Sequence, residues 1–419
     1  MISLQNPDQN RLWRQLMELA EMVEPDQPGF TRRLFSEPYR QSRGWVKEQM
    51  EAAGLEVHVD PVGNLLGATD GARPDLPRLV LGSHTDTVAG AGRFDGMVGV
   101  IGAIEVARLI RQGGEQLRHP LLVVDFLGEE PNRFGLSCLG SRAVVGQLTQ
   151  SHLALRDDND GTLAAALAAQ GSQIDSLSQA VWPAERLHAY LELHIEQGTA
   201  LEAARAPLGV VTAIAGIHRA LITAHGRTDH AGTVSMADRR DALAAGAEVI
   251  LLVERLANHS TTVGTGVGTV GRLEVSPGAT NVVPGQTTAW AEFRSTEAGW
   301  LRDRGSELEL GVGEIARRRG IELRVDWVSA ESPVTCAPGV RQEVLQALRE
   351  LGHPVIELPS GASHDAAQVA RLCPMGMIFV PSLRGRSHCP EEWTDPAAVA
   401  LGVRSLLAGV LRLDQLDSF

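Results

Sequence analysis

The chain has 419 residues, and its 38 lysine and arginine residues against 51 aspartate and glutamate residues give a formal net charge of −13. This charge repels nucleic acid and anionic lipid, which excludes both as expected partners and leaves a small molecule. We find no apolar run near the roughly 20 residues of a membrane helix, no signal peptide in the polar N-terminus, and four scattered cysteines typical of reduced thiols. A soluble cytoplasmic protein is therefore expected.

The first predicted elements alternate between helices and strands. Helical spacing over 11–24 and 40–53 is followed by a short apolar run over 79–81, a helix over 97–112 and a strand over 121–127. A further strand is predicted over 190–194. This alternation is typical of an α/β sheet.

A second, smaller domain is predicted within the first. From 213 to 329 the order is strand, helix (241–257), strand, strand (288–294), helix (297–319) and strand (322–327), which is that of a ferredoxin-like fold. A helix over 339–351 and a strand over 375–380 then resume the α/β pattern. We therefore predict one large domain made of 1–212 and 330–419, interrupted by an inserted domain over 213–329. Two domains also suit the length, because a single core stops growing at about 250–300 residues.

His84 stands at the tip of the predicted strand that contains the run 79–81. A neutral imidazole there can bind a divalent cation through one nitrogen, while Asp86 accepts the proton of the other nitrogen and fixes the tautomer. Asp95 follows a glycine-rich loop that can bend back toward His84. A His-x-Asp pair at a strand end is also often only a hydrogen-bonded turn, so the motif alone leaves both interpretations open.

Three further strand ends carry the same kinds of side chain. The strand over 121–127 leads to Glu129 and Glu130, whose mutual repulsion a dication can offset if one acid binds it and the other acts as a base. An isolated pair of this kind is more often a solvated loop. His194 and His388 follow the other two predicted strands. Because open α/β sheets place their sites at the carboxyl edge, we expect these side chains to lie close together.

Two other motifs carry less weight. Gly266, Gly268 and Gly271 match a dinucleotide-binding fingerprint, but they lead into a strand, the reverse of the required context. Ser137 and Cys138 lack a catalytic local motif, and the chain has no G-x-S-x-G elbow, so a nucleophilic serine or cysteine mechanism has little support.

Taken together, the motifs resemble those of the amidase, hydantoinase and carbamoylase branch of the M20 metallopeptidase family, over nearly the whole chain. That branch contains N-carbamoyl-L-amino acid hydrolases, β-ureidopropionases and allantoate amidohydrolases. The matching motifs are Gly82-Ser83-His84-Thr85-Asp86-Thr87-Val88, Gly92-Arg93-Phe94-Asp95-Gly96, Glu129-Glu130 with Arg133-Phe134-Gly135, His194-Ile195-Glu196-Gln197-Gly198, His230-Ala231-Gly232-Thr233, Asn281-Val282-Val283-Pro284-Gly285 and Ser387-His388-Cys389-Pro390-Glu391-Glu392.

The resemblance implies a fold and a metal centre. The fold is a mixed-sheet, di-metal aminopeptidase-like catalytic domain with an inserted ferredoxin-like lid and dimerisation domain. Two divalent ions per subunit are implied, Zn²⁺ before Mn²⁺, Co²⁺ or Ni²⁺. Asp95 would bridge the two ions, and Glu129 would be the general base. The remaining ligands would be His84 and His194 on one ion, and Glu130 and His388 on the other.

The resemblance also implies substrate contacts. His230 matches an oxyanion stabiliser that reaches the partner subunit of a homodimer, and Asn281 and Arg294 match binders of the substrate carboxylate. The other implied contacts are Gln197, Ser363 and His364. Val234-Ser235 replaces the family's usual Thr-Pro after the His230 motif, which leaves that loop without a restricting proline.

The implied reaction is metal-assisted hydrolysis of the ureido C–N bond of an N-carbamoyl-L-amino acid to the amino acid, ammonia and carbon dioxide. Allantoate, or another ureido or N-acyl amino acid, is the alternative substrate, because the ligand set is shared within the family. A catalytically inactive binding paralogue is the alternative of a different class. It would lack a ligand or the base, and none is missing from this sequence.

Overall fold

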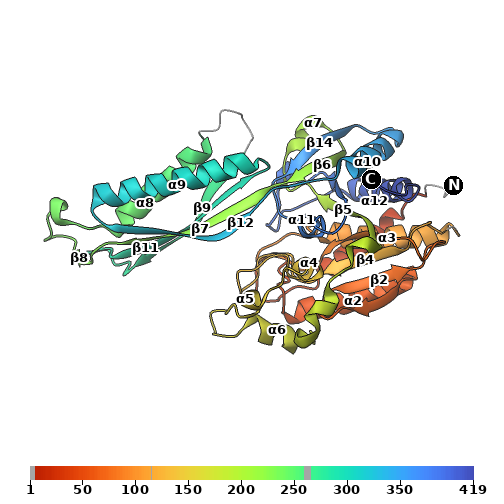
Figure 1. Cartoon of the computed structure of the whole chain (residues 1–419), viewed down its shortest axis with the longest axis horizontal. Helices are drawn as coiled ribbons and strands as arrows, with labels where there is room; N and C mark the ends of the chain where they lie inside the picture. Colours follow the sequence, from red (N-terminus) through yellow and green to blue (C-terminus); the bar gives the residue numbers. More distant parts are fainter. Residues whose placement is uncertain (1–4, 115, 259–265) are drawn as a thin grey trace. The chain divides into compact units, whose positions relative to one another are not determined.

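The structure is a computed structural model that describes residues 5–114, 116–258 and 266–419. It divides into two compact units. Unit 1 comprises Met1–Thr212, Cys336–Leu358 and His364–Phe419, and unit 2 comprises Ala213–Thr335 and Pro359–Ser363. Each unit combines helices with a sheet (Figure 1), so the predicted α/β class is confirmed.

The large sheet contains both parallel and antiparallel strands. Its order is β1-β2-β4-β3-β5-β15-β6-β13, and β14 pairs with β6. Strands β3, β4, β5 and β15 run parallel, whereas β2 and β6 pair antiparallel to their neighbours β4 and β15. The strands are β1 (Glu56–Val59), β2 (Leu65–Thr69), β3 (Arg78–His84), β4 (Leu121–Phe126), β5 (Leu187–Ile195), β6 (Leu208–Ile214), β13 (Val334–Thr335), β14 (Val355–Ser360) and β15 (Met375–Val380).

The four parallel strands end side by side. His84 at the end of β3 is in register with Phe126 of β4, and Val380 at the end of β15 is in register with Ile195 of β5. Their carboxyl ends therefore form one continuous edge, from which the following loops leave.

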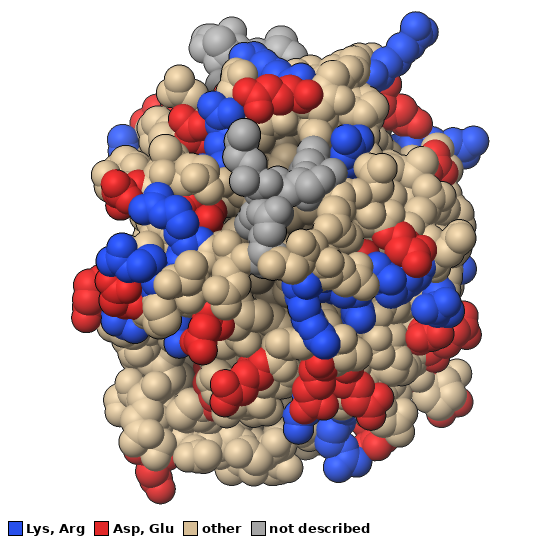
Figure 2. All heavy atoms as spheres, turned by 90° about the vertical axis from the view of Figure 1, so that its right-hand side faces the viewer, with Lys and Arg blue, Asp and Glu red and all other residues tan. Residues whose placement is uncertain are grey.

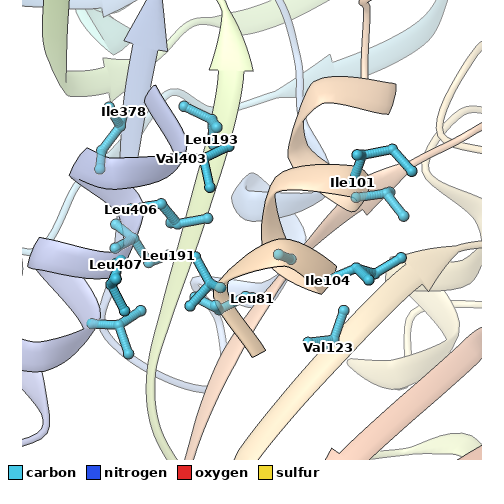
Figure 3. Close-up of a cluster of buried hydrophobic side chains, with 14 of the residues drawn as sticks. Leu81, Ile101, Ile104, Val123, Leu191, Leu193, Ile378, Val403, Leu406 and Leu407 are labelled. Atoms are coloured by element: carbon cyan, nitrogen blue, oxygen red, sulfur yellow. The ribbon is translucent and has the colours of Figure 1, made fainter. Parts of the chain in front are cut away.

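Long helices pack on one face of this sheet. They are α1 (Gln9–Ala20), α2 (Glu37–Ala53), α3 (Met97–Gln112), α10 (Pro338–Glu350) and α12 (Pro396–Leu413). Figure 3 shows Val403 and Leu406 of α12 beside Leu191 and Leu193 of β5, and Ile104 of α3 near Val123 of β4; all of them belong to one buried cluster. Helix α3 has almost no exposed face, because it is covered by the sheet and by its neighbouring helices.

Helix α12 had no predicted counterpart. It is long and apolar enough to cross a membrane by length and composition, which departs from the expectation that no such run exists. Half of that stretch is buried in the protein, including Val403, Leu406 and Val410, as in the core helix of a soluble domain.

Short elements cover the other face and the sheet edge. A second apolar cluster lies among them and contains Leu127, Phe134, Leu139 and Leu163. These elements are α4 (Leu139–Val144), α5 (Gln150–Leu153), α6 (Leu163–Ala169), η1 (Ile174–Ala180), η2 (Ala184–Arg186), α7 (Ala200–Ala204), α11 (Asp365–Val369) and η4 (Leu383–Gly385).

Unit 2 is a four-stranded antiparallel sheet with two helices on one face. The sheet order is β12-β7-β11-β9, and along β11 every second residue is buried, as a sheet covered on one side requires. The long elements follow the predicted β-α-β-β-α-β order. They are β7 (Gly216–His225), α8 (Ala242–Asn258), β9 (Gly266–Ser276), β11 (Gln286–Ser295), α9 (Ala298–Arg319) and β12 (Glu322–Glu331).

Three small elements complete unit 2. They are β8 (Asp229–His230), the 3-10 turn η3 (Met236–Asp238) and β10 (Val282–Val283), and β8 pairs with β10. The glycines of the fingerprint-like motif, Gly266, Gly268 and Gly271, all lie inside strand β9. They therefore form no strand-to-helix turn, and the dinucleotide interpretation is excluded.

The charges are mixed on the face shown in Figure 2. Lysine and arginine side chains alternate there with aspartate and glutamate side chains, and neither sign gathers into a patch on the described part of that face. Such a surface offers no track for a nucleic-acid backbone.

Candidate metal centre

Asp95 is the centre of a cluster of imidazole and carboxylate groups at the carboxyl edge of the large sheet. Its Oδ1 lies 3.2 Å from Nε2 of His194 and 3.7 Å from Nε2 of His84. Its Oδ2 lies 3.1 Å from Nε2 of His388, which is itself 3.3 Å from Oε1 of Glu130. The two oxygens of one carboxylate thus face two different groups of ligand atoms.

Each group is compact enough to hold a cation. The ligand atoms of His84, Asp95 and His194 lie within 4.8 Å of one another, and so do those of Asp95, Glu130 and His388. A third group of this kind consists of Glu192, His194 and His364. In that group Glu192 already accepts hydrogen bonds from the Ser83 hydroxyl at 2.7 Å and the Tyr190 hydroxyl at 2.8 Å. Both carboxylate oxygens of Glu192 are therefore already engaged within the sheet, and we do not propose Glu192 as a metal ligand.

The hydrogen bonds of His194 test whether a cation fits. Its Nδ1 lies 2.9 Å from the carbonyl oxygen of Ile195, and its Nε2 accepts the Gly96 N–H at 3.2 Å. The neutral ring therefore carries its proton on Nδ1, which leaves Nε2 as an acceptor atom 3.2 Å from Oδ1 of Asp95. Two electron-rich atoms at that distance repel each other unless a cation lies between them. The donor set of imidazole nitrogens and carboxylate oxygens suits a divalent metal such as Zn²⁺.

Gly96 lets the His84 ring enter this cluster. The residue has φ +70, and a Cβ built on it would meet three ring atoms of His84 at 2.5–2.6 Å. Any side chain at position 96 would therefore displace the imidazole, and the left-handed backbone also favours glycine.

Asp86 acts differently from the prediction that its carboxylate would take the His84 ring proton. The Nδ1 atom of His84 lies 3.1 Å from the Asp86 carbonyl oxygen and 3.6 Å from its carboxylate. The carboxylate instead accepts the backbone N–H groups of Glu129 and Glu130, at 3.1 and 3.2 Å. Asp86 thus orients His84 through its backbone and ties the Glu129-Glu130 loop to β3 through its side chain.

The buried charges of the cluster shift one another's pKa values. Burial raises the pKa of Glu129 well above its usual value, and the carboxylates of Glu130 and Asp365 raise it further against the opposing effect of His84. Hydrogen bonds that the His388 ring donates to Asp95 and Glu130 raise the pKa of His388 to about 11. Burial raises the pKa of Asp95, but His194 and His388 outweigh it and hold that pKa well below its usual value. Shifts of this kind are typical of functional sites.

Sequence reasoning gave no role to Glu392, although it lies in one of the quoted motifs. Its buried Oε1 accepts the backbone N–H groups of Phe94 at 2.7 Å and Asp95 at 3.2 Å. Its Oε2 accepts the Ser387 hydroxyl at 2.7 Å. Glu392 therefore joins the Asp95 loop to the His388 loop, and its signal in the sequence was a second pair of adjacent glutamates after a strand.

We expect Glu392→Ala to weaken metal binding by about 10–100-fold, the usual cost of losing a partner that orients a ligand. Glu392→Gln keeps one oxygen for the two N–H groups, so it should bind metal within a few-fold of the wild type. Titration of metal-stripped protein with Zn²⁺ measures both variants. Equal affinity of Glu392→Ala and the wild type would contradict this role.

Two predicted substrate contacts lie beside the cluster in unit 1. The Nε2 amide of Gln197 donates to Asp95 Oδ2 at 2.6 Å, and its Oε1 is buried without a hydrogen-bond partner. The His364 ring is 99% buried and packs edge-on against His194 at 4.5 Å between ring centroids. Gln197 and His388 both have left-handed φ values, 57 and 53, which are uncommon for residues with a Cβ and cluster at functional sites.

The other four predicted substrate contacts belong to unit 2, where they lie at two separate places. Asn281 lies beside His230, since its carbonyl oxygen accepts the Ala231 N–H at 2.9 Å next to the β8–β10 pair. Arg294 lies near the opposite end of β11, where its guanidinium donates to Glu292 at 2.5 Å and to the Gly361 carbonyl at 3.2 Å. Ser363 ends the segment 359–363, which also contains Gly361. Arg294 is therefore already engaged by an anionic side chain, which the sequence did not predict.

The chain matches the model of peptidase family M20/M25/M40 over residues 80–412. The chain belongs to this family. An N-carbamoyl-L-amino acid amidohydrolase from Geobacillus stearothermophilus is 39% identical over 97% of this chain and 98% of its own length. A ureidoglycolate hydrolase from Arabidopsis thaliana is 36% identical over 96% of this chain and 86% of its own length. The crystal structure of AtUAH in complex with glyoxylate covers 98% of both chains at 35% identity and a TM-score of 0.91.

Because the chain belongs to this M20 family, it is a hydrolase, and its candidate ligand groups are those of a hydrolase. The described part of unit 1 carries every residue that the family resemblance named as a ligand or base, within one cluster.

Proposed function

We propose that this M20 enzyme hydrolyses the ureido C–N bond of N-carbamoyl-L-amino acids. One water molecule is consumed, and the products are the amino acid, ammonia and carbon dioxide. The observation that carries the proposal is the cluster around Asp95 with Glu129 beside it, in a chain similar over nearly its full length to a relative named for that substrate.

Two divalent ions would be held by the cluster, with Asp95 shared between them. One would take His84 and His194, and the other Glu130 and His388. Bound there, the ions would supply Lewis acidity toward the attacking water and the scissile carbonyl. Zn²⁺ suits the donor set best, and Mn²⁺, Co²⁺ or Ni²⁺ are the alternatives.

Glu129 is the base in this proposal. Its Oε2 lies 3.8 Å from Nε2 of His84, but Glu129 belongs to none of the compact ligand groups among the described residues. It would take a proton from the attacking water and return it to the leaving nitrogen. Burial raises its pKa, which makes it a stronger base than a solvated carboxylate.

Unit 2 would bind the substrate and form the homodimer. Gln286 and Arg294 are eight positions apart along β11, or roughly 27 Å at about 3.4 Å per residue, and strand β8, which ends at His230, lies beyond the Gln286 end (Figure 1). His230 and Arg294 of one chain are therefore too far apart to contact one small substrate. This separation supports a dimer in which His230 and Asn281 serve the partner's site.

The test is an ammonia-release panel on purified protein of known metal content. We expect N-carbamoyl-L-amino acids to be the best substrates, ahead of N-carbamoyl-β-alanine, allantoate, ureidoglycolate and N-acyl amino acids. A higher kcat/KM for allantoate would replace the proposed substrate by the alternative one. No turnover of any compound by metal-loaded protein would indicate the inactive paralogue.

Arg294→Ala is expected to raise KM about 10–100-fold with little change in kcat, because a charge-assisted hydrogen bond to the substrate carboxylate would be lost. Arg219→Ala is the matched control, since Arg219 also donates to Glu292, at 2.5 Å, and its loss frees Glu292 in the same way. Steady-state kinetics on the best substrate measures both. An unchanged KM in Arg294→Ala would remove Arg294 from substrate binding.

A further inference from the structure

A buried thiol touches the carboxylate of Glu129. The Sγ atom of Cys138 lies 3.4 Å from Oε1 of Glu129, with the S–H as donor. The other oxygen, Oε2, lies 3.8 Å from Nε2 of His84. The two oxygens therefore have distinct surroundings, one beside the thiol and one beside the ligand atoms.

The backbone holds Cys138 against Glu129. The Cys138 N–H donates to the Glu129 carbonyl at 2.7 Å, and the next two N–H groups donate to Gly128 at 2.9 Å and Leu127 at 2.7 Å. Cys138 also has φ 55 and ψ 41, a left-handed conformation that is uncommon for a residue with a Cβ. These contacts fix the direction of the thiol, and only 1% of Cys138 is exposed.

We propose that Cys138 is a positioning residue for Glu129, which rests on the role of Glu129 given above. The thiol holds Oε1, so that Oε2 stays turned toward the ligand atoms where the attacking water must lie. A base misplaced by about 1 Å can lose about 100-fold in rate, so orientation of this carboxylate matters directly. Because the thiol is buried and donates to a carboxylate, its role differs from that of a nucleophile, which agrees with the absence of a nucleophile motif around it.

The test compares alanine and serine at position 138. Both residues carry a Cβ, so the cost of the left-handed backbone is the same, but only serine offers a hydrogen-bond donor. We expect Cys138→Ala to lower kcat about tenfold with KM and metal content within twofold of the wild type. Cys138→Ser should retain kcat within about threefold. Equal losses in the two variants, or an unchanged kcat in Cys138→Ala, would overturn the proposal.

Cys373→Ala is the matched control for loss of a buried thiol. Cys373 is 6% exposed, and burial alone raises its pKa, to about 12. Its replacement should leave kcat unchanged. If Cys373→Ala lowers kcat as much as Cys138→Ala does, the effect is one of packing.

A double variant separates this proposal from the proposed function. In the Glu129→Gln background, Cys138→Ala should cause no further loss, because the group that it positions has already been removed. An additional tenfold loss would show that Cys138 acts elsewhere. If Glu129→Gln alone keeps near-normal turnover, the base assignment itself fails, whatever the result at position 138.

Discussion

Glu129→Gln is expected to lower kcat by about 10²–10⁴-fold, the usual contribution of a positioned general base. The amide keeps the shape of the side chain, including an oxygen for the Cys138 thiol at 3.4 Å in the wild type, but it cannot accept the proton of the attacking water. Since Glu129 is proposed as a base and not as a ligand, the variant should retain its metal. Ammonia release and metal analysis on the same sample measure the two effects together.

Glu48→Gln is the control for this variant, because Glu48 is an exposed residue of α2 that undergoes the same chemical change. It should match the wild type in both measurements. Near-normal turnover of Glu129→Gln would remove Glu129 from the role of base. Loss of metal from Glu129→Gln would instead make it a ligand.

Asp95→Asn is expected to abolish metal binding at both candidate metal positions and to lower kcat by at least about 1,000-fold. Asp95 is the only residue of the described clusters whose two oxygens face the two pairs of ligands, with Oδ1 3.2 Å from His194 and Oδ2 3.1 Å from His388. The amide presents one neutral oxygen and one NH₂ group, which only donates, so it cannot serve both sides. Metal content by mass spectrometry and kcat on the best substrate check the result.

A graded comparison sharpens this prediction. His388→Ala removes a ligand from one side only, so it should retain more metal than Asp95→Asn. Asp26→Asn, on an exposed turn, should retain all of it. If Asp95→Asn bound two equivalents of metal per chain, Asp95 would not be shared between two ions.

Much of the fold followed from local patterns. The helix over 97–112 and the strand over 375–380 have the predicted bounds, because a buried helix and a buried parallel strand each carry a continuous apolar signal. The strands β1 and β6 were missed, since one is largely exposed and the other pairs antiparallel beside β15 without alternation along its length. Helix α12 was missed although it carries an apolar run comparable to that of α3.

Part of the site was also determined by the sequence. His84, Glu129, Glu130 and His194 follow or end strands whose carboxyl ends lie at one edge of the sheet, so their residue types and positions alone predicted that they would meet. That inference needs only the parallel order of the strands, which apolar runs in the sequence indicate.

Contacts between distant segments were decided by the tertiary structure alone. Glu392 binds the backbone of Phe94 across 298 residues of sequence, and the Cys138 thiol meets Glu129 only because the backbone after β4 turns back on itself. Asp86 reaches Glu129 and Glu130 with its carboxylate because β3 and β4 are parallel neighbours that end side by side. A sequence specifies which groups can donate, accept or bind a cation, but the distances between them depend on how strands and loops pack, and those distances decide which role each group takes.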